Sequence, residues 1–290
     1  MKTLDLHRAK ISDFLSNNGP GDSEYDEFDK IVNSIDNESE GSDFREAISE
    51  VLDSDTLFGY TFKKPFGYAG DFILIEKIYS RHLSDDTNAR KWDKFYHSHA
   101  ATEAVRNRKS YFINKLEDLV VNGDGKEKHI LILGCGPGTD VHEFFEKHKA
   151  ATAKFDLLDI DPGAIDYASR KNARYLERIT FTKANVMRFR TEKQYDLIWS
   201  AGLFDYLDDR LFVFLLKRFK NNVKDSGQII IGNFSTNNPT IKVMEVMTEW
   251  YLNYRDEKHL KKLAVQSAIE LNRISVEKEP LGINLFLKIK

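Results

Sequence analysis

The residues best suited to chemistry lie in the segment 131–140, which reads LILGCGPGTD. Gly134, Gly136 and Gly138 form a G-x-G-x-G pattern between an apolar run and a helix expected to begin near Thr139. Glycines let the backbone turn sharply and approach a ligand closely, and the amino terminus of a helix favours a carboxylate or a phosphate. Dinucleotide-binding loops place their third glycine one residue later. The segment therefore predicts a cofactor loop of a different, shorter type.

An acidic side chain follows the next apolar run, which is expected to be a strand at 155–160. Asp159 lies about 20 residues after the glycine loop, where a carboxylate can accept both hydroxyls of a ribose. Asp161 precedes Pro162 and is expected to cap a helix over 162–173. The alternative is that both acids only cap this helix. The glycine loop at this distance favours ribose binding by Asp159.

These residues lie where apolar runs alternate with helical patterns. The expected strands are 129–134, 155–160, 179–185, 195–200 and 228–234. Such alternation predicts an α/β fold with a parallel, doubly wound sheet. The tail 275–290 predicts two further strands joined by a turn at Leu281-Gly282.

The first 125 residues have a different texture. Their apolar residues recur at helical spacing, and helices are expected at about 41–53, 71–83, 87–100 and 101–121. Asp71 is placed to cap the second of these helices. We therefore divide the chain into an all-helical cap or lid, 1–125, and a core, 126–290. Two roles stay open for the helical region, which either closes over a substrate or forms a homodimer interface.

The glycine loop with Pro137 resembles the first motif of the class I S-adenosylmethionine (SAM)-dependent methyltransferases. The resemblance covers residues 129 to about 235 and implies a Rossmann-like sheet of seven strands that ends in an antiparallel hairpin. It also implies that Asn185 receives the adenine amino group, that Val186 packs on the ring, and that residues 200–204 flank the methionine and the reacting methyl. The cofactor residues implied are Gly134, Cys135, Gly136, Gly138, Asp140, Asp159, Ile160, Asn185, Val186, Ser200, Ala201 and Gly202.

Helices before the core cover SAM in many such enzymes. The resemblance therefore implies that Tyr96 and Arg106 reach the carboxylate of the cofactor. Cys135 lies inside the glycine loop, where small residues are required, and is not expected to be reactive. The product of the cofactor would be S-adenosylhomocysteine (SAH).

Four further stretches are more specific: KPFGYAGD at 64–71, SAGLFDYL at 200–207, GNF at 232–234 and WYLNYRD at 250–256. Together they resemble a bacterial methyltransferase family whose best-known member makes the methyl ester of a 3-hydroxy fatty acid, a secreted signal. The resemblance implies O-methylation of a carboxylate or hydroxyl on a fatty-acid-like molecule or a secondary metabolite. The candidates for positioning this substrate are Tyr68, Tyr206, Tyr254 and Arg255.

Arg255 has two interpretations. Its guanidinium could hold a substrate carboxylate in a bidentate pair. Alternatively, Asp256 caps a helix over 257–266 and Arg255 makes only a surface ion pair.

Composition excludes several classes of function. The 290 residues carry a formal net charge of -3, so the chain has no general attraction to phosphate backbones, and no nucleic-acid partner is expected. Its one cysteine excludes a disulfide within the chain and indicates a reducing, cytoplasmic setting. No apolar run approaches the ~18 residues that span a bilayer, so no membrane is expected. His97 and His99 have no further ligands at metal-site spacing, so no metal is predicted.

Three rival functions remain open. The first is an N-methyltransferase of a small metabolite or a nucleic acid, although the N-P-P-Y or D-P-P-Y motif that amino-directed nucleic-acid enzymes usually show is replaced here by Ser-Ala-Gly-Leu at 200–203. The second is a SAM-binding partner protein without catalysis. The third is an NAD-dependent oxidoreductase, which a titration with SAM and NAD would distinguish.

Overall fold

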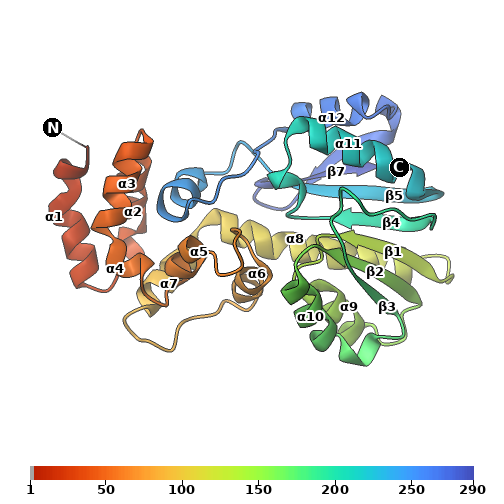
Figure 1. The fold of residues 1–290 in the computed structure, drawn as a ribbon, viewed down its shortest axis with the longest axis horizontal. Helices are drawn as coiled ribbons and strands as arrows, with labels where there is room; N and C mark the ends of the chain where they lie inside the picture. Colours follow the sequence, from red (N-terminus) through yellow and green to blue (C-terminus); the bar gives the residue numbers. More distant parts are fainter. Residues whose placement is uncertain (1–2) are drawn as a thin grey trace. The chain divides into compact units, whose positions relative to one another are not determined.

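The computed structural model describes residues 3–290, so the first two residues of the expected helical region lie outside it. The chain forms two compact units (Figure 1). Unit 1 contains the described residues up to Glu103 together with Asn238–Tyr251, and unit 2 contains Ala104–Asn237 together with Leu252–Lys290. The sequence places the boundary near residue 125 instead. Helix α8 (Ala100–Leu116) continues across the observed boundary. Because the helix is not interrupted there, the sequence does not mark the division between the two units.

Unit 2 is built on a seven-stranded sheet in the order β3-β2-β1-β4-β5-β7-β6. Its strands are β1 (Lys128–Leu133), β2 (Ala153–Asp159), β3 (Ile179–Lys183), β4 (Tyr195–Ser200), β5 (Val223–Phe234), β6 (Ile274–Lys278) and β7 (Asn284–Ile289). The first five run parallel, and β7 runs antiparallel to both β5 and β6. The predicted sheet with its terminal hairpin is confirmed (Figure 1).

Apolar alternation along the strands covers both faces of this sheet. On β1, Ile130 and Ile132 belong to the core that contains residues of α8 and α9 (Thr139–Lys147). Leu131 and Leu133 belong to the opposite core, with residues of α11 (Asp209–Phe219) and α12 (Glu257–Gln266). Successive side chains of a strand point to opposite faces, so a central strand in such a fold is apolar throughout.

The regular elements of unit 1 that the structure describes are helical. They are α1 (Thr3–Ser16), α2 (Tyr25–Asn33), α3 (Glu38–Ala47), α4 (Ser49–Leu52), α5 (Leu57–Lys63), α6 (Phe72–Tyr79), α7 (Arg90–Ser98), the start of α8, and turns that include a π-helical one at Val243–Met247. Asp71 caps α6 as predicted, because its Oδ1 accepts hydrogen bonds of 2.9 Å from the N–H groups of Ile73 and Leu74. Along the described chain, helices long and apolar enough to cross a lipid bilayer are absent.

Candidate functional site

The glycine loop that follows β1 has the backbone conformation that its residue types require. Gly134, Gly136 and Gly138 have φ angles of +71°, +53° and +62°, a region that other residues rarely adopt. A Cβ on Gly138 would lie 3.1 Å from the Cβ of Ala168, so this glycine permits close packing of α9 on α10 (Pro162–Lys171). A Cβ on Gly136 would meet no described atom within 4 Å. Gly136 is thus the position where the loop backbone is open to a ligand.

The carboxylate of Asp159 lies against this loop. Its Oδ2 accepts a hydrogen bond of 2.9 Å from the N–H of Gly136, and its Oδ1 accepts one of 3.1 Å from the N–H of Asp161. Burial raises the pKa of Asp159 above its usual value, and the two backbone donors oppose this rise. Asp161 accepts from the N–H of Gly163 at 2.7 Å, which confirms its predicted role as the cap of α10.

The loops described so far lie where the parallel strands end, at the carboxyl edge of the sheet. The ends of β2 and β3 add an apolar and a polar group to this edge. Ile160, directly after β2, is 60% exposed, which is high for a large apolar side chain. The N–H of Ala184 donates to the backbone oxygen of Asp159 at 2.8 Å, so the loop after β3 lies beside Asp159. Asn185 follows in this loop and is exposed, while Val186 packs partly on the sheet. The structure therefore brings these predicted cofactor residues together at one edge.

Two other predicted cofactor residues lie near the loop, Asp140 half-buried and Cys135 buried. Asp140, in the first turn of α9, accepts from the N–H of Val141 at 2.8 Å, and burial raises its pKa to about 6. Cys135 is buried and unpaired, and burial raises the pKa of its thiol well above the usual value. A thiol that stays protonated is a poor nucleophile, in line with the expectation that Cys135 is unreactive.

The loop after β4 lies at the same edge of the sheet. In this loop the structure contradicts one prediction, the cofactor role of Ser200. Ser200 was expected to bind the cofactor, yet it is 1% exposed and its Oγ donates to the backbone oxygen of Leu133 at 2.9 Å. Ser200 therefore ties β4 to β1. Gly202, at φ +89°, and the half-buried Ala201 follow it. The Cβ of Leu203 lies 3.3 Å from the Cβ position of Gly134, so the two loops touch.

The structure also overturns the substrate role of Arg255. Its side chain is 1% exposed, and its Nη1 donates to Oδ1 of Asn233 at 2.8 Å and to the backbone oxygen of Phe204 at 3.2 Å. Its Nε donates to Asp209 at 3.1 Å, and its Nη2 donates to the backbone oxygen of Leu207. All three guanidinium nitrogens thus have internal partners. Arg255 stabilises the loop after β4, and Asp256 caps α12 as the alternative interpretation held.

The remaining candidates lie in both units. In unit 2, Tyr206 is 40% exposed and Tyr254 is half-buried. Arg106 is buried on α8. In unit 1, Tyr68 is 36% exposed, and Tyr96 is buried with its hydroxyl accepting from Thr61 at 3.1 Å. The assignment of these side chains to substrate or cofactor stays a prediction.

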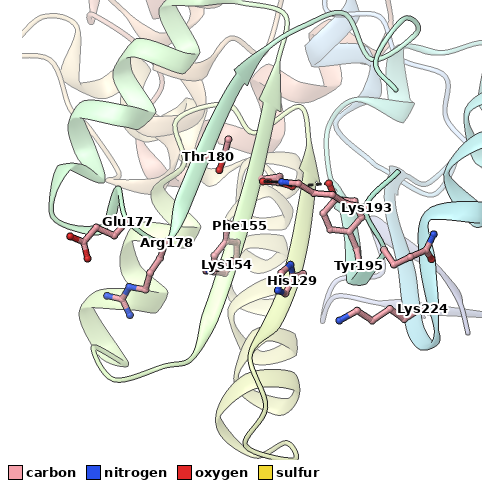
Figure 2. Close-up of a pocket in the computed structure, with 11 residues that line it drawn as sticks. His129, Lys154, Phe155, Glu177, Arg178, Thr180, Lys193, Tyr195 and Lys224 are labelled. Atoms are coloured by element: carbon pink, nitrogen blue, oxygen red, sulfur yellow. Dashed lines mark hydrogen bonds and ion pairs between the residues drawn. The ribbon is translucent and has the colours of Figure 1, made fainter. Parts of the chain in front are cut away.

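A cavity of about 470 Å³ lies at the other edge of the sheet, where the strands β1 to β4 begin (Figure 2). Two of its lysines form ion pairs, Lys193 with Asp156 at 2.8 Å and Lys224 with Asp196 at 2.7 Å. Asp196 also accepts from the N–H of His129, so its carboxylate links the first residues of β1 and β5 to β4. Ligands of open α/β sheets bind at the carboxyl ends of the strands. This cavity is therefore not the cofactor site.

Comparison with known proteins agrees with this geometry. Residues 130–227 match a family model described as a methyltransferase domain. Malonyl-[acyl-carrier protein] O-methyltransferase 1 of Ilyobacter polytropus is 33% identical over 104 residues, which are 36% of this chain and 37% of that relative. The match thus spans little more than a third of the relative.

Solved structures share the fold at low sequence identity. A possible exported protein from Bordetella parapertussis has a TM-score of 0.63 and 16% identity, with 76% of this chain and 78% of that chain covered. Magnesium protoporphyrin IX methyltransferase from Synechocystis PCC 6803, with SAH bound, has a TM-score of 0.51 and 13% identity over 74% and 96%. The apo SAM-dependent methyltransferase SibL has a TM-score of 0.53 and 14% identity over 87% and 77%.

The strand order, the glycine loop, the acid at the end of β2 and the matched family model together define unit 2 as a class I SAM-dependent methyltransferase domain. Its cofactor is S-adenosylmethionine. The residues present fit this molecule, because Gly136 lets the loop backbone approach it, Asp159 offers a carboxylate for the ribose, and Ile160 offers an exposed apolar surface for the adenine.

Proposed function

We propose that this protein transfers a methyl group from SAM to a carboxylate oxygen of a fatty-acid-like or acyl-chain molecule and so forms a methyl ester. The observation that carries the proposal is the 33% identity to an O-methyltransferase of malonyl-[acyl-carrier protein], since a malonyl group ends in a free carboxylate. The family resemblance carried by residues 64–71 and 200–207 supports the same acceptor class.

The demands of this reaction match what the chain offers. When bound, SAM supplies a methyl group that its sulfonium has already activated, so that a carboxylate oxygen takes it by in-line displacement and leaves SAH. A carboxylate is ionised at pH 7 and needs no general base, whereas a hydroxyl or an ammonium acceptor does. The task of the chain is then orientation, which contributes about 7–11 kcal/mol in well-aligned reactions. Asp159 and the glycine loop hold the cofactor, and Tyr206 and Tyr254 are our candidates for aligning the acceptor.

Two further parts of the proposal rest on the sequence. The segment Ser-Ala-Gly-Leu at 200–203 and the net charge of -3 favour a small-molecule acceptor over a nucleic acid. We also place the reaction in the cytoplasm, because the one cysteine of the chain indicates a reducing compartment.

The test is a product assay with methyl-labelled SAM. The purified protein is incubated with malonyl-acyl carrier protein, free fatty acids and 3-hydroxy fatty acids, and products are identified by mass spectrometry. We expect a labelled methyl ester that alkali hydrolyses, and much less of it from Asp159→Ala when SAM is below saturation. Label in an alkali-stable ether or amine would overturn the carboxylate acceptor. Binding of SAH without any product would overturn the catalytic proposal.

A further inference from the structure

Arg108 on α8 is a buried cation whose Nε has no hydrogen-bond partner among the described residues. Its side chain is 6% exposed, its Nε is buried with no hydrogen-bond partner, and its guanidinium forms no hydrogen bond or ion pair with any described residue. The Nη1 and Nη2 atoms lie 3.2 Å from the Cβ position of Gly202, so any side chain at position 202 would displace them. Leaving a charge buried and uncompensated costs several kcal/mol. Such a group calls for a ligand that the protein itself does not supply.

Asp205 is the acid near Arg108, and it does not satisfy the guanidinium. The charge of Arg108 acts on Asp205, whose pKa burial nevertheless raises to about 6. Oδ1 of Asp205 accepts from the N–H of Phe234 at 2.6 Å, and its backbone oxygen accepts from the N–H of Asn253 at 2.7 Å. Hydrogen bonds between Asp205 and Arg108 are absent from the described chain.

Asn284, the first residue of β7, is a second buried polar group of this kind. It is 1% exposed, and neither its Oδ1 nor its Nδ2 has a hydrogen-bond partner among the residues described. Its Oδ1 lies 3.5 Å from the Cβ position of Gly232, and the Cβ of Ala201 lies 3.3 Å from that same position. Arg108 therefore borders Gly202, and Asn284 borders Gly232, which the preceding loop residue Ala201 also contacts.

Helix α8 packs on β7 through residues that neighbour these two side chains. Tyr111 stacks on Phe286 with ring centroids 3.8 Å apart and planes 7° apart. Arg108 precedes Tyr111 by one helical turn, and Asn284 precedes Phe286 by two strand positions, so each shares a face with its stacking neighbour. Both lie toward the edge where β5 ends, because β7 is antiparallel to β5 and Asn284 pairs with Phe234.

A neighbouring pair of the same residue types provides the contrast. Arg255 and Asn233 are equally buried, but Arg255 donates to Asn233, and Nδ2 of Asn233 donates to the backbone oxygens of Phe234 and Asn253 at 2.9 Å. That arginine–asparagine pair is internally complete. Arg108 and Asn284 have the same chemistry with their hydrogen-bonding capacity unused.

The position of Asn284 in the sheet separates it from the ribose-binding acid Asp159. Asp159 ends β2, whereas Gly202 follows β4 and Asn284 begins β7. In the order β2-β1-β4-β5-β7, strands spaced by about 4.8 Å put β7 roughly 19 Å from β2. Asn284 thus lies toward the other half of this edge, away from the ribose-binding acid, and Arg108 borders the loop after β4 in the middle of the edge.

We propose that Arg108 and Asn284 bind the carboxylate of the methyl acceptor beside the Ala201–Gly202 loop. The proposal rests on the proposed function and names the residues that recognise its substrate class. Arg108 offers the planar donor fork that suits a carboxylate, and the amide of Asn284 adds a donor. Burial away from water strengthens both interactions and makes the site selective for an anion.

The test measures acid binding without turnover. A free fatty acid is titrated by calorimetry into the SAH complex of the wild type, of Arg108→Met and of Arg108→Lys. The affinity for SAH is measured on each variant beforehand. Arg255→Met is the matched control for stability, because it removes an arginine whose nitrogens are all engaged.

We expect Arg108→Met to weaken acid binding by about 10- to 150-fold, the range for hydrogen bonds to a charged group, with Arg108→Lys in between and the affinity for SAH unchanged. Arg108→Met should keep or raise the Tm of the apo protein, whereas Arg255→Met should lower it. Weaker SAH binding by Arg108→Met would overturn the proposal, because it would assign the guanidinium to the cofactor. An unchanged acid affinity of Arg108→Met, or no acid binding by the wild type, would also overturn it. So would equal losses of Tm in Arg108→Met and Arg255→Met. Arginine-dependent acid binding without methyl ester formation would refute the proposed function and leave the acid site standing.

Discussion

The N–H of Gly136 donates a 2.9 Å hydrogen bond to Oδ2 of Asp159, and this bond joins the glycine loop after β1 to the acid at the end of β2. The two motifs lie 23 positions apart in the sequence and become one surface through this contact. The carboxylate is therefore oriented before any ligand arrives. Orientation in advance reduces the entropy lost on binding.

Asp159→Ala should weaken SAH binding by about 1.5–3 kcal/mol, roughly 10- to 150-fold, because it removes hydrogen bonds from the ribose to a charged group. Calorimetry with SAH measures this. The matched control is Asp156→Ala on the same strand, which removes the partner of Lys193 and Tyr195 at the far edge of the sheet. The control should bind SAH like the wild type. Equal affinity of a folded Asp159→Ala would refute the assignment of the cofactor site.

Replacing Gly136 or Gly138 by alanine should show which glycine serves ligand binding and which serves packing. Both Gly136→Ala and Gly138→Ala place a side chain at positive φ, which costs about 1–2 kcal/mol. At Gly138 the new Cβ also meets Ala168 at 3.1 Å, so overpacking adds about 1–3 kcal/mol. Chemical denaturation should show the larger loss for Gly138→Ala, and SAH titration the more selective loss for Gly136→Ala. The reverse order would mean that Gly136 serves packing.

Arg255→Met should destabilise the protein by about 3–5 kcal/mol, because it removes one partner from a buried network and leaves Asn233 unsatisfied. Urea unfolding measures the loss. In the folded variant the affinity for acid acceptors should fall far less than in Arg108→Met, since internal partners engage the guanidinium of Arg255. A normal stability with a large rise in KM would restore the substrate role that the sequence suggested.

Asp205 should contribute stability at low pH that is lost as the pH rises from about 4 to about 6. Burial raises its pKa from the usual 3.8 to about 6 in the folded state. The unfolded chain therefore releases this proton first, so the stabilisation present at low pH is lost as the pH passes through that range. The shift corresponds to about 3 kcal/mol.

Asp205→Asn tests this linkage, because an amide oxygen can still accept from the N–H of Phe234. Urea unfolding at pH 4 to 8 should give a flatter profile for the variant and a higher stability at pH 7. Parallel profiles for the two proteins would show that Asp205 ionises normally in the fold.

Much of the sheet could be predicted from the sequence, because β1 and β4 are buried on both faces and read as continuous apolar runs. The start of β5 could not. It begins at Val223, five residues before the predicted position, and its first half carries Lys224 and Asp225. Lys224 pairs with Asp196 of β4 at 2.7 Å, a contact across strands that no local pattern reveals.

Some residues of the site could likewise be predicted from the sequence, and others could not. Glycine spacing and the acid after β2 have local signatures, so Gly136 and Asp159 were predictable. Arg255 was misassigned because a charge beside aromatic residues looks like a ligand contact, while its partners come from distant segments. Arg108 and Asn284 were missed because a basic residue on a helix and an asparagine after a turn usually face solvent. Only the packing of Tyr111 on Phe286 shows that both are buried.

The most direct test of the account is calorimetry of the wild-type protein with SAH and, in parallel, with NAD⁺. We expect saturable binding of one SAH per chain and no binding of NAD⁺, because the loop from Gly134 to Gly138 has the shorter methyltransferase spacing and Asp159 supplies the ribose acceptor. Binding of NAD⁺ without binding of SAH would contradict the cofactor assignment and every proposal that depends on it.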